Sequence, residues 1–120
     1  MTGCVDSNGR ALIPITLEHP TSARSATLEI WIDTGFTGQV MISKTALATL
    51  NLPIAQKGVA ILADGSTVSI QSYQGRLHWF GQDVDVEVIA ADGSESLLGV
   101  GLLLGHQLHI NYVNNTLTLT

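Results

Sequence analysis

Apolar and polar side chains alternate along several stretches of this chain. Residues 26–32 read Ala-Thr-Leu-Glu-Ile-Trp-Ile, and residues 83–88 read Asp-Val-Asp-Val-Glu-Val. A period of two is typical of a β-strand that buries one face and leaves the other in water. The chain is therefore expected to fold into a mostly β structure around a single core.

Turn signals divide the rest of the chain into further strands. Asn8-Gly9, Asp64-Gly65, Gly81-Gln82 and Asn114-Asn115 each fit a tight turn or a hairpin. Together they indicate about eight strands, with one or two short helices. The clearest helix should begin after Ser43 as its N-cap. Strands are expected over residues 11–17 (at an edge or irregular, because of Pro14), 26–32, 39–42, on both sides of the two central hairpin turns, and at 107–113 and 116–120.

Composition narrows the class of protein. The 120 residues fit a single domain spanning 1–120, and 45% hydrophobic with 12% charged residues disfavours disorder. A net charge of −5, with five scattered basic residues, argues against a nucleic-acid partner. The start shows no signal peptide and no apolar run is long enough to cross a membrane, so a cytoplasmic protein without a membrane partner is expected. So few charges also suggest that some apolar surface is hidden against a second copy.

One acid stands in an unusual place. Asp33 directly follows the apolar strand over residues 26–32 and begins the triplet Asp33-Thr34-Gly35. A carboxylate at the end of a buried strand costs free energy unless it is hydrogen-bonded, paired or protonated. Asp, Thr and Gly are also common turn residues, so the triplet alone is compatible with a simple turn.

The order of features along the chain extends the pattern. The Asp-Thr-Gly triplet precedes a short strand and a helix, then the hairpin tipped by Asp64-Gly65, a second hairpin, Leu97-Leu98-Gly99, a helix and a closing strand. Over residues 10–120 this order resembles the retropepsin-like aspartic proteases, in particular the small single-domain clan AA proteases of prokaryotes. The resemblance implies a closed β-barrel with one or two short helices and one lobe per chain.

The resemblance also implies an activity, hydrolysis of peptide bonds by an aspartic-type endopeptidase that needs no cofactor. Splitting an amide with water requires one group that takes a proton and another that gives one, and two adjacent carboxyl groups can share these roles. The sequence holds only one Asp-Thr-Gly. The second carboxylate must then be Asp33 of a second copy, in a two-fold symmetric homodimer with the site on its axis. The expected substrate is an extended, mostly apolar segment of a peptide or protein.

Roles for the matching positions follow from the same resemblance. Asp33 would be catalytic, Thr34 would hydrogen-bond across the two-fold axis, and Gly35 would let the backbone turn tightly beside the carboxylate. The apolar segment of Leu97, Leu98 and Gly99 would pack behind this loop, support it and keep water away from it.

The hairpin tipped by Asp64 and Gly65 would act as a flap over the substrate. Apolar substrate pockets would be lined by flap and loop residues, namely Ile61, Leu62, Ala63, Phe36 and Val100. The C-terminal strand, residues 117–120, would interleave with the ends of the partner.

Two positions depart from the family pattern. Phe36 stands where viral relatives usually have Ala, so the ring could narrow the substrate groove or fill a pocket. Gly101 stands where many prokaryotic relatives have Asp, which removes a polar anchor at the start of the helix. A metal site is disfavoured. His106 and His109 are three residues apart, but they are expected where a helix ends and a strand begins. His19 and His78 have no companion acids at ligand spacing.

Two alternatives remain open at this level. The chain could be a retropepsin-like module for dimerisation or peptide binding with weak or no catalysis, since fold does not fix function. It could instead be an unrelated β-barrel in which Asp33 only turns the chain, and such a protein would be a monomer.

Overall fold

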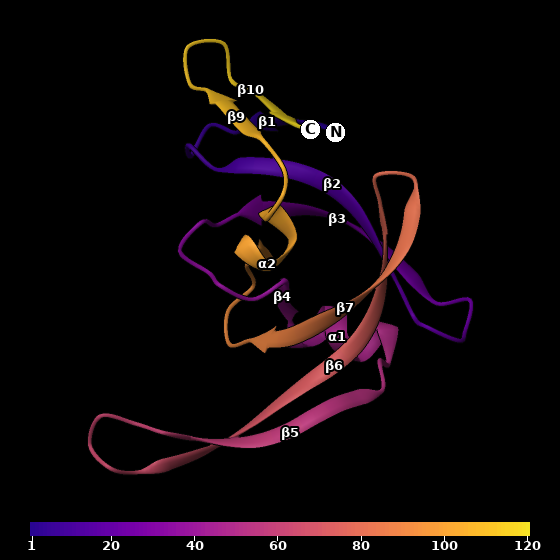
Figure 1. Ribbon diagram of the computed structural model, residues 1–120, viewed down its shortest axis with the longest axis vertical. Coiled ribbons are helices and arrows are strands. Elements are labelled where there is room, and N and C mark those ends of the chain that lie inside the picture. The colour runs from indigo at the N-terminus through magenta and orange to yellow at the C-terminus, as the bar shows by residue number, and fades with distance from the viewer.

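The computed structural model describes residues 1–120 as ten strands and two short helices within 44 × 39 × 27 Å. Their order along the chain follows the colours of Figure 1. Two strands, β1 and β8, were not expected from the sequence. The elements are β1 Thr2–Val5, β2 Ala11–Glu18, β3 Ser25–Ile32, β4 Val40–Ser43, α1 Lys44–Leu50, β5 Ile54–Ile61, β6 Thr67–Trp79, β7 Gln82–Ala91, β8 Leu97–Leu98, α2 Val100–Leu103, β9 Leu108–Asn111 and β10 Thr116–Leu119.

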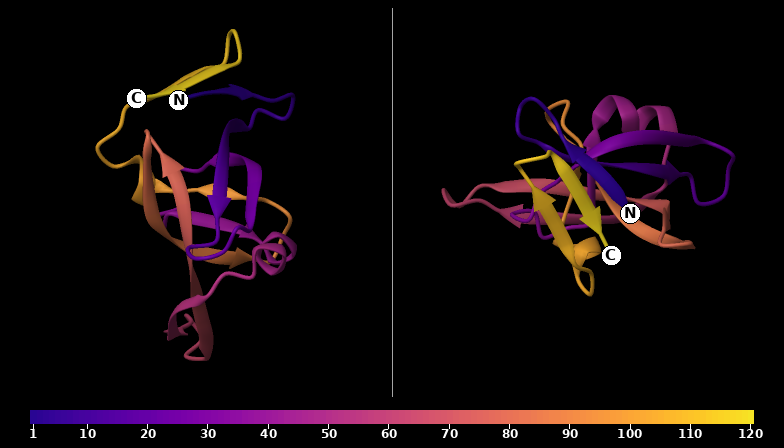
Figure 2. Two further views of the ribbon diagram at one scale, coloured as in Figure 1. Left: turned by 90° about the vertical axis from the view of Figure 1, so that its right-hand side faces the viewer. Right: turned by 90° about the horizontal axis from the view of Figure 1, so that it is seen from above.

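All ten strands belong to one mixed sheet in the order β5-β6-β7-β4-β8-β3-β2-β1-β10-β9. An additional pairing of β6 with β2 joins the six central strands into a ring. Only two residue pairs close this ring, Leu17 with Leu77 and Glu18 with Arg76. The remaining strands lie outside the ring: β5 pairs with β6, and β1, β10 and β9 follow β2 in the sheet order. Figures 1 and 2 show the β5–β6 and β9–β10 hairpins projecting from the ring.

The core lies inside the ring and follows the alternation seen in the sequence. In β2 every second residue from Ala11 to Leu17 is buried, and in β3 Ile30 and Ile32 are buried while Leu28 packs against the core. The acidic face of β7 is exposed, as expected. Because the apolar face of each strand points into the ring, the side chains on that face are taken out of contact with water.

The local signals around α1 are confirmed by its capping geometry. The Ser43 side chain accepts a hydrogen bond from the backbone N–H of Ala46, and Asn51 ends the helix in the left-handed conformation.

The second hairpin turn, between β6 and β7, is one residue earlier than expected. Trp79 pairs with Gln82, so the turn residues are Phe80 and Gly81, and both have positive φ.

Pro14 lies in β2, which has neighbouring strands on both sides except along one short stretch. The β2 strand pairs with β1 at Ala11 and Leu12 and with β6 at Leu17 and Glu18, so between these points only β3 lies beside it. The expectation of an edge or irregular strand is therefore met locally, at the one stretch where β2 lacks a second neighbour.

The two ends of the chain pair with each other. The β10 strand lies between β1 and β9, and Thr2, Gly3 and Cys4 pair with Thr118, Leu117 and Thr116. The expectation that residues 117–120 interleave with a partner was wrong, because both edges of β10 are occupied within the chain.

Neither of the two short helices has the length and apolar character needed to cross a membrane.

Candidate active site

Asp33 lies immediately after β3 and is half-buried. Its backbone N–H donates to the carbonyl oxygen of Leu98 at 2.9 Å, which continues the pairing of β3 with β8. Its carboxylate Oδ1 accepts a hydrogen bond from the backbone N–H of Gly35 at 2.8 Å. The carboxylate is thus held by its own loop while it remains in contact with water. Thr34 and Gly35 are exposed.

The two-residue strand β8 fixes this loop from behind. It pairs parallel with β3, where Trp31 lies opposite Leu97, and antiparallel with β4, where Val40 lies opposite Leu98. Because β8 separates β3 from β4, the loop of residues 33–39 must pass around its end. Leu97 and Leu98 are thus held between the strand that precedes the Asp33 loop and the strand that follows it.

Backbone hydrogen bonds tie the far half of the loop to the start of α2. The N–H of Gly99 donates to Gln39 O at 2.9 Å, that of Val100 to Phe36 O at 2.8 Å, and that of Gly101 to Gly38 O at 3.0 Å. With the Asp33 bond they hold both halves of the loop. Gly101 lacks the carboxylate that many prokaryotic relatives have at this position, but these backbone hydrogen bonds still anchor the loop.

Gly99 has no space for a side chain. A Cβ there would fall on the carbonyl oxygen of Gly38 and lie 2.5 Å from that of Phe36. The Phe36 ring also lies against the glycines, 2.6 Å from the Cβ position of Gly99 and 2.5 Å from that of Gly38. The half-buried ring is folded back onto its own loop, so its first role is to pack the loop.

The hairpin expected to be the flap is formed by β5 and β6 and is largely exposed. Ile61 is 78% exposed and Leu62 is 47% exposed, while Ala63 and Gly65 are also open to water. The carboxylate of Asp64 accepts hydrogen bonds from the Ser66 hydroxyl at 2.6 Å and from the Ser66 N–H at 2.9 Å. These two bonds lower the pKa of Asp64 and order the tip.

The structure therefore divides the expected site residues into two groups. The first surrounds Asp33 and includes Phe36, Val100 and residues 97–99, all joined by strand pairing or backbone hydrogen bonds. The second is the hairpin tip, residues 61–65. Within one chain, β5 pairs only with β6, and the hairpin projects away from the ring in Figure 1.

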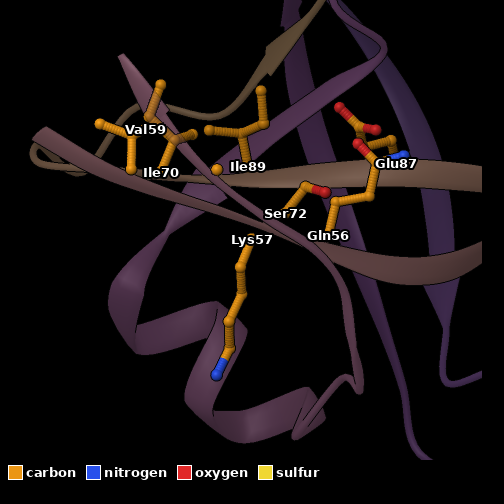
Figure 3. Close-up of a pocket in the computed structure, with 8 residues that line it drawn as sticks. Gln56, Lys57, Val59, Ile70, Ser72, Glu87 and Ile89 are labelled. Carbon is orange, nitrogen blue, oxygen red and sulfur yellow. The ribbon is translucent and has the colours of Figure 1, made fainter. Parts of the chain in front are cut away.

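A pocket of about 210 Å³ lies along the base of this hairpin (Figure 3). Its apolar walls are Val59, Ile70 and Ile89, and its polar groups include Ser72 and Glu87. The Ser72 hydroxyl is buried and has no hydrogen-bond partner within the protein. A second hollow of about 490 Å³ shares Ile70 and Ile89. None of these lining residues was expected from the sequence, because in an alternating strand nothing marks Ser72 as different from its neighbours.

The histidine side chains do not form a shared metal-binding cluster. His106 stacks on Phe80, with ring centroids 4.4 Å apart, and its Nε2 accepts from the indole N–H of Trp79 at 3.4 Å. His78 pairs with Asp83 at 3.1 Å on the exposed face of the sheet. No group of three or more His, Cys, Asp or Glu side chains is arranged to hold a metal ion.

Comparison with solved structures identifies the fold. The chain is similar to the crystal structure of a retropepsin-like aspartic protease from Rickettsia conorii, with a TM-score of 0.63 over 99% of this chain and 87% of that one. Sequence identity is 15%. No protein-family model and no curated protein sequence matches the chain. The expected mostly β, retropepsin-like fold is thus confirmed by three-dimensional likeness.

Proposed function

We propose that this protein is a homodimeric aspartic endopeptidase whose active site is formed by Asp33 from each of two copies. The observation that carries the proposal is the setting of Asp33. Its carboxylate meets solvent at the end of a core strand, accepts the N–H of Gly35, and sits in a loop anchored by four backbone hydrogen bonds. A turn residue that only reverses the chain does not need this support.

Catalysis would depend on bringing the two carboxyl groups within about 3 Å, where they cannot both be ionised and so share one proton. The ionised carboxylate would take a proton from a water held between them as that water attacks the peptide carbonyl carbon. The protonated carboxyl would donate its proton to the carbonyl oxygen. Collapse of the tetrahedral intermediate would break the C–N bond, with a proton passing to the leaving nitrogen. The pair would titrate as a unit.

Thr34 and Gly35 would serve this pair. Both are exposed in the single chain, as expected for residues that meet a partner across an axis. The Thr34 hydroxyl would hydrogen-bond to the loop of the second copy beneath the carboxyl groups. Gly35 would continue to donate its N–H to the ionised carboxylate.

The substrate would bind as an extended strand between the Asp33 loop and the β5–β6 hairpin, held by main-chain hydrogen bonds. The exposed Ile61 and Leu62, together with the apolar walls of the hairpin pocket, favour apolar side chains. The hairpin would close over the peptide and exclude water. Phe36 and Val100 would line the floor beside the catalytic loop.

The proposal is tested by cleavage of a proteome-derived peptide library at about pH 3 to 8, read by mass spectrometry. Wild type is compared with Asp33→Asn, and Asp92→Asn serves as the matched control because Asp92 is an exposed acid in another Asp-Gly turn. Cuts between apolar residues that disappear only with Asp33→Asn would support the proposal. A folded dimer that cuts nothing would favour a peptide-binding or dimerisation module instead.

A further inference from the structure

One carboxylate beside the hairpin pocket has no basic partner. The acids of β7 form a row on the exposed face of that strand, and each lies opposite a residue of β6. Two of them contact the basic residue opposite, in the pairs His78–Asp83 at 3.1 Å and Arg76–Asp85 at 3.9 Å. Glu87 lies opposite Gln74, which carries no charge, and its carboxylate makes no ion pair. The free carboxylate of this row is therefore the one that lines the pocket.

The pocket has a polar part next to its apolar walls. Gln56, Ser72 and Glu87 supply its polar atoms, and Figure 3 shows the Ser72 hydroxyl on the side of the other two. Ser72 is only 6% exposed, and its hydroxyl has no hydrogen-bond partner within the protein. A buried hydroxyl in this state costs free energy until something bonds to it. Ser72 is thus available to a polar group that enters the pocket.

Lys57 does not neutralise Glu87, although it also lines the pocket. Gln56 lies opposite Ser72 in the β5–β6 ladder, and successive side chains of a strand point to opposite faces. Lys57 therefore points away from the face that carries Ser72. Figure 3 shows its side chain extending away from the other labelled residues.

The pocket is connected to the Asp33 loop. Gln39, at the end of that loop, accepts the backbone N–H of Glu87 through its side-chain Oε1 at 2.7 Å and the N–H of Gly99 through its backbone oxygen at 2.9 Å. One residue thus anchors both the strand that carries Glu87 and the segment behind Asp33.

A row of directly opposed residues leads from the strand before Asp33 to the pocket. It crosses six neighbouring strands through Trp31, Leu97, Met41, Ile89, Ser72 and Gln56. Directly opposed side chains share one face of a sheet. Trp31 and Ser72 are four strand spacings apart, at most about 19 Å, which about six residues of extended peptide can span. A peptide cut at Asp33 can therefore reach the pocket.

From these observations we infer that the pocket binds one basic side chain, arginine or lysine, of the peptide substrate, with Glu87 as its counter-charge. The inference rests on the proposed function and deepens it, because it adds a charged position to a substrate that is otherwise apolar. A volume of about 210 Å³ is below the roughly 300–1,000 Å³ of small-molecule sites and suits a single side chain.

Both parts of the pocket match a basic side chain. The aliphatic stem of arginine or lysine packs on apolar surface while the charged end stays with polar groups. Both charged ends carry hydrogen-bond donors only, and the pocket offers the acceptors they need in Glu87, Ser72 and the amide oxygen of Gln56. An acidic side chain would instead be repelled by Glu87, and the net charge of −5 acts in the same direction.

Cleavage specificity tests the inference. The library cut by wild type is aligned on the broken bond, and Arg and Lys should be enriched at one fixed position within about six residues of it. Two synthetic peptides are then compared that differ only at this position. Arg should raise kcat/KM about fivefold over Met, the upper range for one partly exposed ion pair. No enrichment at any position would overturn the inference.

Variants of Glu87 assign the preference to its carboxylate. Glu87→Gln should reduce the Arg-to-Met ratio to below about twofold, and Glu87→Lys should transfer the preference to a Glu peptide. Asp85→Asn is the matched control, because it removes one acid from the same strand outside the pocket and should keep the ratio. The exposed position of the Glu87 side chain makes these changes compatible with folding. An unchanged ratio in Glu87→Gln would overturn the inference.

Ser72→Ala separates ligand binding from folding. Removing a buried hydroxyl that has no partner should leave the protein at least as stable as wild type in urea denaturation. The Arg-to-Met ratio should nevertheless fall at least about twofold, because the hydroxyl no longer accepts from the bound cation. Loss of stability with an unchanged ratio would overturn the role of Ser72 in the pocket.

Failure of the pocket and failure of the proposed function give different results. Fluorescence anisotropy measures binding of the same peptides to Asp33→Asn, so that the preference can be read without cleavage. Stronger binding of the Arg peptide that is lost with Glu87→Gln, in a protein whose wild type cuts nothing, would support the pocket and count against the peptidase. Asp33-dependent cleavage without a basic preference would overturn the pocket and leave the peptidase in place.

Discussion

The backbone N–H of Asp33 donates to the carbonyl oxygen of Leu98 at 2.9 Å, and this bond joins the candidate catalytic loop to a segment far along the chain. The two residues meet because β8 lies between β3 and β4. A group placed by a strand and its hydrogen bonds can be held more firmly than one on a free loop. The geometry of Asp33 should therefore depend on residues 97–99 as much as on its own loop.

Replacing Gly99 by Ala should destabilise the protein by about 3 kcal/mol, at the upper end of overpacking effects. The added Cβ meets the carbonyl oxygens of Gly38 and Phe36, which are backbone atoms and cannot rotate away. Urea denaturation measures the loss. Gly93→Ala is the matched control, because a Cβ there meets nothing within 4 Å. Equal stability of the two variants would contradict the packing described for the loop.

Replacing Ser43 by Ala should cost about 1 kcal/mol of unfolding free energy, since the side chain caps α1. Its hydroxyl accepts from the Ala46 N–H at 3.2 Å. The same change at the exposed Ser94 should have little effect. If denaturation curves of the two variants coincide, the cap does not contribute to stability.

The tip of the β5–β6 hairpin should respond to acid through Asp64. Hydrogen bonds from the Ser66 hydroxyl and N–H lower its pKa, so the ionised form stabilises the turn. A lowered pKa in the folded state means that this stabilisation is present above the ordinary pKa, near 4, and is lost as pH falls through the depressed value. The Ser66 amide should therefore titrate by NMR with a midpoint below the ordinary value.

The control for this titration is Ser66→Ala, which removes the hydroxyl donor and keeps the backbone N–H. The midpoint followed at residue 66 should then rise toward the ordinary Asp value. A midpoint that does not move would show that the hydroxyl does not lower the pKa of Asp64.

Local features of the fold could be read from the sequence because their causes are local. The alternation in β3 and β7, the Ser43 cap, and the Asp64-Gly65 turn each depend on residues a few positions apart. The position of Asp33 at the end of a buried strand was predicted for the same reason. The likeness of the whole chain to retropepsins came from the order of these features along it.

Other features depend on distant partners and were missed. The strand β1 has no alternation of its own and forms because β10 and β2 lie on either side of it. Its pairing with β10 also explains why the expected interleaving of the C-terminal strand was wrong. The two residues of β8 become a strand only between β3 and β4. The pocket at Ser72 likewise appears only when β5, β6 and β7 are assembled.

The central claim, that one site needs Asp33 from two chains, is tested most directly by mixing. Peptidase activity is measured at constant wild-type concentration while folded Asp33→Asn chain is added and subunits are allowed to exchange. Random pairing with an equal amount of variant leaves about half of the wild-type chains in wild-type dimers, so activity should fall to about half and decline further with more variant. Activity that stays constant, or a wild-type chain that cleaves no peptide, would contradict the account.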